Sequence, residues 1–190
     1  MDSLLKEVRN CTICADFLPH TPRPVVSIHP GSKVLIIGQA PGSKVHASGI
    51  PWQDKSGENL RDWMGVSTEE FYNPELFGII PMGFCYPGKG KSGDLPPRPE
   101  CAPQWHEALI NMMPDVQLTL LIGQYAQAYY LKGRKEKNLT ETVLNFGNYL
   151  PWFMPLVHPS PRNQIWMKRN PWFISDLLPE LKLLIRSIIN

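Results

Sequence analysis

The stretch Val34-Leu35-Ile36-Ile37-Gly38-Gln39-Ala40-Pro41-Gly42 decides the fold class of this chain. Its first four residues are a continuous apolar run, which is typical of a strand buried on both faces of a parallel sheet. Comparable runs occur at 77–81, 118–122 and 149–157. Because helical patterns separate these runs, the sequence predicts an α/β fold of three layers, α/β/α, around a mainly parallel four-stranded sheet.

The expected helices surround these strands in the order that a parallel sheet requires. They cover Leu4 to Val8, a segment opening at Ser56 with Leu60, Trp63 and Met64 on one face, Pro103 to Met113, Tyr125 to Leu131, and Leu177 to Ile189. The segment 87–103 is rich in glycine, proline and lysine and is expected to be a long loop. The 190 residues, 43% of them hydrophobic, are enough for one well-cored domain, so we expect a single domain over 1–190.

The candidate site follows from the position of the loops in such a sheet. Ligands of open α/β sheets bind at the carboxyl ends of the strands. Three segments should meet there: 38–42, 81–85 and 158–163. Gly38 and Gly42 allow a close approach of the backbone to a small ligand. Neither the P-loop motif nor the dinucleotide-binding glycine motif is present, so a phosphate-binding interpretation is poor.

The third segment, His158-Pro159-Ser160-Pro161-Arg162-Asn163, carries the clearest signal of the three. Two prolines fix the backbone around a hydroxyl group, and a histidine stands at the end of a predicted strand. Such a rigid turn suits contact with a DNA backbone while the histidine points inward. A purely structural proline-rich turn is the alternative.

Four cysteines, Cys11, Cys14, Cys85 and Cys101, are the only ones in the chain. A C-x2-C pair followed by two distant cysteines suits a [4Fe-4S] cluster or a tetrahedral zinc ion, since both take four sulfur ligands. Two structural disulfides, or four unrelated buried thiols, are the alternatives.

Charge and hydropathy limit the compartment and the partners. Residues 1–7 have no secretory pattern, and no apolar run is long enough to cross a bilayer. We therefore expect a soluble, cytoplasmic protein without a membrane partner, whose thiols stay reduced. The net charge of +2 is compatible with nucleic acid but does not require it. The oligomeric state is open, with a monomer expected.

Taken in order along the chain, these motifs resemble those of the uracil-DNA glycosylase superfamily, nearest its iron–sulfur branches, families 4 and 5. The matching elements are the N-terminal C-x2-C, G-Q-A-P-G at 38–42, G-I-P-W-Q-D-K-S-G at 49–57, the two later cysteines, and H-P-S-P-R-N at 158–163. The resemblance implies the glycosylase fold and a structural [4Fe-4S] cluster on all four cysteines. It also implies that the loop between the last two cysteines lies near DNA.

The resemblance assigns base-binding and DNA-binding roles by position. Trp52 corresponds to the aromatic residue that stacks on the extruded base, although a core tryptophan is the alternative. Gln39, with Ala40 beside it, would contact the base or the attacking water, and Asn163 matches the asparagine of the family 5 form H-P-S-x-x-N. The expected DNA contacts are Ser160, Arg162 in the gap left by the flipped nucleotide, and the loop cations Lys89, Lys91 and Arg98. The alternative for the loop cations is that they are solvated and have no partner.

The resemblance also assigns the catalytic residues, with two departures from the family pattern. His158 would donate a hydrogen bond to the base as negative charge accumulates on it. The catalytic carboxylate of the best-known branch is replaced by Ala40, and the glutamate of family 4 by Gln39. Asp54, in D-K-S-G, resembles the water-activating aspartate of family 5, but it is also placed to cap a helix.

The second departure concerns base selection. The family usually reads uracil with an asparagine amide four residues before the third cysteine, and that position is Pro81 here. Either a backbone group substitutes for the amide, or specificity is broader, or the protein no longer excises uracil. The loss should relax selectivity most, since unmatched buried hydrogen bonds give the largest discrimination. Two hypotheses follow: a DNA-repair hydrolase that excises uracil or another deaminated base, and a catalytically reduced relative that binds nucleic acid or a nucleotide. A redox or zinc protein unrelated to DNA is a weaker third.

Overall fold

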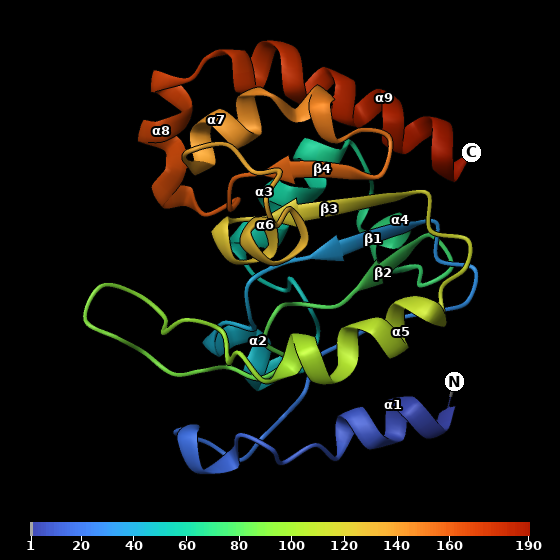
Figure 1. The fold of residues 1–190 in the computed structure, drawn as a ribbon, viewed down its shortest axis with the longest axis vertical. Coiled ribbons are helices and arrows are strands. Elements are labelled where there is room, and N and C mark those ends of the chain that lie inside the picture. Colours follow the sequence, from blue (N-terminus) through green and yellow to red (C-terminus); the bar gives the residue numbers. More distant parts are fainter. Residues whose placement is uncertain (1) are drawn as a thin grey trace.

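A computed structural model describes residues 2–190 of the chain. Its centre is a four-stranded sheet with the strand order β2-β1-β3-β4, in which every pair is parallel. The strands are β1 (Val34–Ile37), β2 (Phe77–Ile79), β3 (Leu118–Ile122) and β4 (Phe153–Leu156). Helices cover both faces (Figure 1), so the predicted three-layer α/β/α architecture is confirmed.

The alternating side chains of β1 show why its sequence is apolar throughout. Val34 and Ile36 belong to one core cluster, while Leu35 and Ile37 belong to the other, and all four are at most 1% exposed. The first cluster includes side chains from α3 (Lys55–Met64), α4 (Thr68–Tyr72) and α9 (Leu178–Ile189). The second includes side chains from α1 (Asp2–Arg9), α5 (Glu107–Asn111) and α6 (Gln124–Tyr130).

The structure adds short elements that the sequence pattern does not reveal. The additional helices are α2 (Ser43–Ser48), α4, α7 (Leu139–Leu144) and α8 (Gln164–Arg169), with 3-10 turns at Ala15–Phe17, Phe146–Tyr149 and Pro161–Asn163. These helices have five or six residues, which is too short to show a 3.6-residue period. The helix expected over 103–113 begins as a π-helical turn, Ala102–His106, and a second π-helical turn, Phe173–Leu177, precedes α9.

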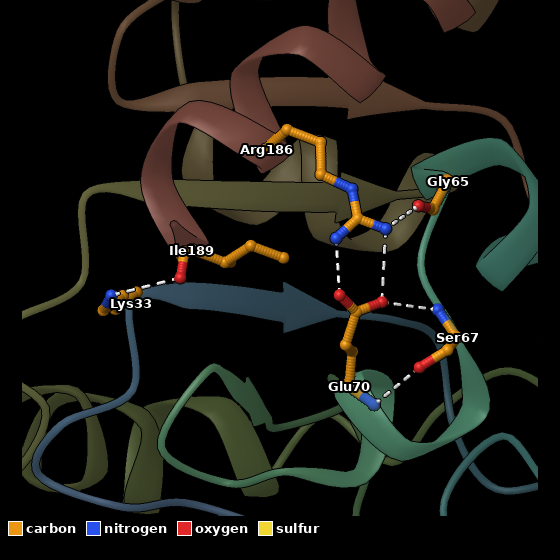
Figure 2. A network of polar contacts seen from close by, with 6 residues as sticks. All are labelled: Lys33, Gly65, Ser67, Glu70, Arg186 and Ile189. Atoms are coloured by element: carbon orange, nitrogen blue, oxygen red, sulfur yellow. Dashed lines mark hydrogen bonds and ion pairs between the residues drawn. The ribbon is translucent and has the colours of Figure 1, made fainter.

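Polar contacts fix the C-terminal helix against α4 and the segment that joins α3 to α4 (Figure 2). Arg186 of α9 donates to Glu70 Oε1 at 2.5 Å and to Oε2 at 3.2 Å, and also to the Gly65 carbonyl at 2.5 Å. Glu70 in turn forms a capping box with Ser67, at 2.7 and 3.1 Å. Lys33 donates to the carbonyl of Ile189 at 3.4 Å. These bonds hold α9 in the helical layer that also contains α3 and α4.

Glu70 should make the stability of the fold depend on pH. The hydrogen bonds from Arg186 and Ser67 lower the pKa of this carboxyl from 4.5 to about 2. Because the folded-state pKa is depressed, the stabilisation is complete above the usual pKa and is lost as the pH falls toward about 2. We expect Glu70→Gln to flatten the fall in urea stability between neutral and acidic pH. Glu75→Gln, at an exposed glutamate without an ion pair among the described residues, should leave that fall unchanged.

Candidate active site

A cavity of about 550 Å³ opens where the strands end. All three segments that follow β1, β2 and β4 contribute to its wall, together with residues 51–56 and part of the loop 87–95. In Figure 1 this loop, yellow-green, extends beyond the same end of the sheet. Nine of the predicted catalytic, base-binding and DNA-binding residues line this one cavity: Gln39, Ala40, Trp52, Asp54, Lys89, His158, Ser160, Arg162 and Asn163.

Trp52 owes its position to an unusual backbone and to two glycines. It has a φ of 57°, in the left-handed region, and is the one residue other than glycine with a positive φ among those described. A Cβ on Gly38 would lie 2.7 Å from the indole, and a Cβ on Gly57 would lie 1.8 Å from the Trp52 carbonyl oxygen. The ring is half-buried against the core and also lines the cavity, so its role as a platform for a base stays a prediction.

His158 lies beside Trp52, with ring centroids 5.8 Å apart and planes tilted by 36°. Two amide side chains hold its loop: Asn163 Nδ2 donates to the His158 carbonyl at 2.7 Å, and Asn59 Nδ2 donates to the Pro159 carbonyl at 2.8 Å. Asn163 therefore supports the histidine backbone while its side-chain oxygen stays free of the described hydrogen bonds. Asn59, from α3, has no signal in the sequence that would mark this role.

The electrostatics of His158 favour its neutral form. Burial lowers the pKa of the imidazole below its usual 6.5, while the carboxylates of Asp54 and Asp94 act in the opposite direction. Desolvation is the largest of these causes, so the ring is uncharged at neutral pH. A neutral imidazole is still able to donate a hydrogen bond from one nitrogen.

Asp54 stands at the start of α3 and lines the cavity. Its Oδ1 accepts from the Gly57 N–H at 2.9 Å, so the helix-capping role that the sequence allowed is present. Oδ1 therefore caps the helix, while Oδ2 has no hydrogen-bond partner among the described residues. The catalytic role of Asp54 stays a prediction.

The wall at Pro81 offers little to read the edge of a base. Its carbonyl accepts from His106 Nε2 at 3.1 Å, and Tyr130 OH lies 2.6 Å from the other ring nitrogen. Burial lowers the pKa of His106 to about 4, so the ring is neutral and Tyr130 must be the donor. The next two N–H groups, of Met82 and Gly83, donate to the carbonyls of Gly38 and Gln39 at 2.9 Å each. The predicted loss of the amide reader is therefore not compensated by this stretch of backbone.

The loop that follows Cys85 forms part of the cavity wall. Its arms pair at Lys89 and Asp94, with Gly90 N–H donating to Gly93 O at 2.7 Å and Leu95 N–H to Gly88 O at 2.8 Å. Arg162 Nη1 donates to the Ser92 carbonyl at 3.1 Å, which ties the loop to the H-P-S turn. Lys91 is exposed near the tip and does not line the cavity.

Arg98 lies apart from the other predicted DNA contacts. Its guanidinium pairs with both carboxylate oxygens of Glu100 and stacks over the Phe17 ring, 4.5 Å from the centroid. It does not line the cavity. Its charge acts on the thiol of Cys14, whose pKa it lowers against the stronger effect of burial. Arg98 thus belongs to the surroundings of the cysteines.

All four cysteines are free thiols, so the disulfide alternative is not what the structure contains. Cys14, Cys85 and Cys101 are buried, and Cys11 is partly exposed. The thiols are close enough to affect one another: charges on Cys101, Cys14 and Cys11 help to raise the pKa of Cys85 to about 12, after burial as the main cause. The Phe84 N–H donates to Cys101 Sγ at 3.5 Å. Within residues 2–190, no three His, Cys, Asp or Glu side chains form a group that could hold one metal ion.

The sequence also matches a known protein family. The model of the uracil DNA glycosylase superfamily matches residues 26–182, which is most of the chain. The chain belongs to the uracil DNA glycosylase superfamily. The N-terminal cysteine pair lies outside the matched segment. No helix among the described residues combines the length and apolar character needed to cross a membrane.

Proposed function

We propose that this protein is a DNA glycosylase that hydrolyses the N-glycosidic bond of uracil or a related deaminated base in DNA. The observation that supports it most is one cavity that holds an aromatic platform, a neutral histidine and a carboxylate: Trp52, His158 and Asp54. The bond between sugar and base cannot be reached while the base is stacked inside a duplex, so the enzyme extrudes the nucleotide into such a pocket. Lys89, Ser160 and Arg162 at the mouth would contact the DNA backbone.

Each residue supplies one part of the reaction. The flipped base stacks on Trp52, and its bond to the sugar breaks with the electron pair going to the base. His158 donates a hydrogen bond to the negative charge that develops on the base, where a preorganised donor is most effective. Asp54 accepts a proton from the water that attacks the sugar carbon. The products are the free base and an abasic site.

The four cysteines would hold a [4Fe-4S] cluster, with zinc as the alternative. The chemistry of the donors suits such a group: all four thiols are free, three of them are buried, and the Phe84 N–H donates to Cys101 Sγ. The described side chains are nevertheless not gathered around a single metal ion, so the proposal rests on the type and burial of the donors. Such a group would supply rigidity to the N-terminal segment and the loop after β2, because Cys11 and Cys14 come from the first and Cys85 and Cys101 flank the second.

A catalytically reduced relative that binds nucleic acid is the second candidate. Ala40 and the blocked wall at Pro81 favour it, because neither supplies the group that the family pattern has there. Incubation with an oligonucleotide that carries one uracil, followed by alkali, separates the two. Strand cleavage at the uracil supports the glycosylase, while salt-dependent binding without cleavage supports the second candidate.

Asp54→Asn tests the water-activating role. Asparagine caps helices about as well as aspartate, so the fold should be preserved. We expect the single-turnover excision rate to fall by about 10²-fold, the typical contribution of a general base. Asp62→Asn removes the same charge from the exposed side of α3 and should leave the rate unchanged. Equal rates for Asp54→Asn and wild type would show that Asp54 is only a helix cap.

A further inference from the structure

Asp94 places a second carboxylate in the cavity wall. It comes from the loop after Cys85, and no sequence motif marks it as a site residue. Its side chain lines the cavity wall, and Oδ2 lies 3.5 Å from the point where a Cβ on Gly42 would be. It therefore lies against the G-Q-A-P-G turn, two residues beyond Ala40. Tyr86 OH donates to Oδ1 at 3.4 Å, while Oδ2 has no hydrogen-bond partner among the described residues.

The position of this carboxylate is built into the loop. Asp94 pairs with Lys89 across the two arms, and bonds between Gly90 and Gly93 and between Leu95 and Gly88 close the turn. The tip is fixed by Arg162 through the Ser92 carbonyl. At the base of the loop, Tyr86 is 6% exposed and stacks on His20, with centroids 5.7 Å apart. The backbone of Asp94 is thus fixed by pairing between the two arms of the loop, and its side chain accepts a hydrogen bond from Tyr86.

The charge of Asp94 reaches the centre of the site. Burial lowers the pKa of His158, and the carboxylates of Asp54 and Asp94 both act in the opposite direction. Asp54 already uses one oxygen for the helix cap. Asp94 is exposed in the free protein, and DNA placed over the cavity would remove water from it, which strengthens its interaction with any nearby positive charge.

We propose that Asp94 is a second catalytic carboxylate, which stabilises the positive charge that develops on the sugar and so takes the role that Ala40 cannot fill. This inference rests on the proposed glycosylase function. When the bond between sugar and base breaks, the electron pair leaves with the base and the sugar becomes cationic. Water then bonds to the sugar carbon and gives its proton to Asp54. Asp94 remains ionised throughout and acts through its charge alone.

The test compares Asp94→Asn with wild type on a uracil-containing oligonucleotide under single-turnover conditions with saturating enzyme. We expect a rate at least about 10-fold lower, with DNA affinity equal to or higher than that of wild type and the melting temperature unchanged. Asp62→Asn serves as the charge-matched control. Ala40→Asp added to Asp94→Asn should restore part of the rate, because it returns a carboxylate to the same wall of the cavity.

The outcomes separate this inference from the function on which it rests. Excision by wild type and Asp94→Asn at equal rates would overturn the role of Asp94 and leave the glycosylase function standing. A loss that tracks weaker DNA binding would also overturn it, since Asp94 would then act in binding. Absence of excision by wild type on any deaminated base would overturn both.

Discussion

Replacement of His158 by alanine is expected to lower the single-turnover excision rate by about 10²- to 10³-fold. The imidazole lies beside the Trp52 ring, and in the proposed mechanism it donates to the negative charge that appears on the base only as the base leaves. Alanine removes this donor while Asn163 and Asn59 still hold the loop through the carbonyls of residues 158 and 159. The variant should therefore fold and bind DNA as wild type does.

The pH dependence of the rate gives an independent check on the histidine. Burial keeps the pKa of His158 below its usual value, so the working, neutral form persists from alkaline pH into the mildly acidic range. We expect wild type to lose activity only at acidic pH, in part because the ring becomes protonated. His158→Gln, which keeps an N–H donor without a titrating ring, should retain more activity than alanine and lose the part of the acidic dependence that the histidine causes. An alanine variant with the wild-type rate would contradict the assignment.

The sequence predicts the sheet well because burial on both faces leaves a strong pattern. The apolar runs at 34–37 and 118–122 are β1 and β3 to the residue, and each lies in the middle of the sheet. The run at 77–81 is longer than β2, which ends at Ile79, because the chain turns there to form the cavity wall. Helices of five or six residues escape prediction because they depend on caps and tertiary contacts.

The candidate site is predictable only where a residue type signals its chemistry. Histidine and tryptophan in proline-bounded turns are visible in the sequence, and both line the cavity. Asp94 is not, because a carboxylate in a loop rich in glycine, lysine and proline looks like any solvated charge. Its place depends on pairing within the loop and on Arg162, contacts that join residues 70 positions apart. The left-handed backbone of Trp52 is equally invisible, since it follows from the close packing of Gly38 and Gly57.

The other large effect is expected at the cysteines. Cys101→Ser should abolish the incorporation of iron and sulfide and destabilise the protein by about 3 kcal/mol or more, since binding of a structural metal group contributes directly to folding free energy. Cys101 is 6% exposed and its sulfur accepts from the Phe84 N–H at 3.5 Å. Serine puts a smaller, poorer ligand at this buried position, so the proposed group would be lost and the thiols of Cys85 and Cys14 would remain in a poorly hydrated environment.

The prediction is checked on anaerobically purified wild type and Cys101→Ser by measuring iron, sulfide and zinc content, visible absorbance and melting temperature. None of these measurements depends on activity. Ala102→Ser is the matched control, because it places the same hydroxyl one residue further along at a site 3% exposed. It should cost stability but retain the metal. Zinc without sulfide would select the zinc alternative. Metal content and stability of Cys101→Ser equal to those of wild type would contradict the four-cysteine site, because a buried sulfur ligand cannot be removed without consequence.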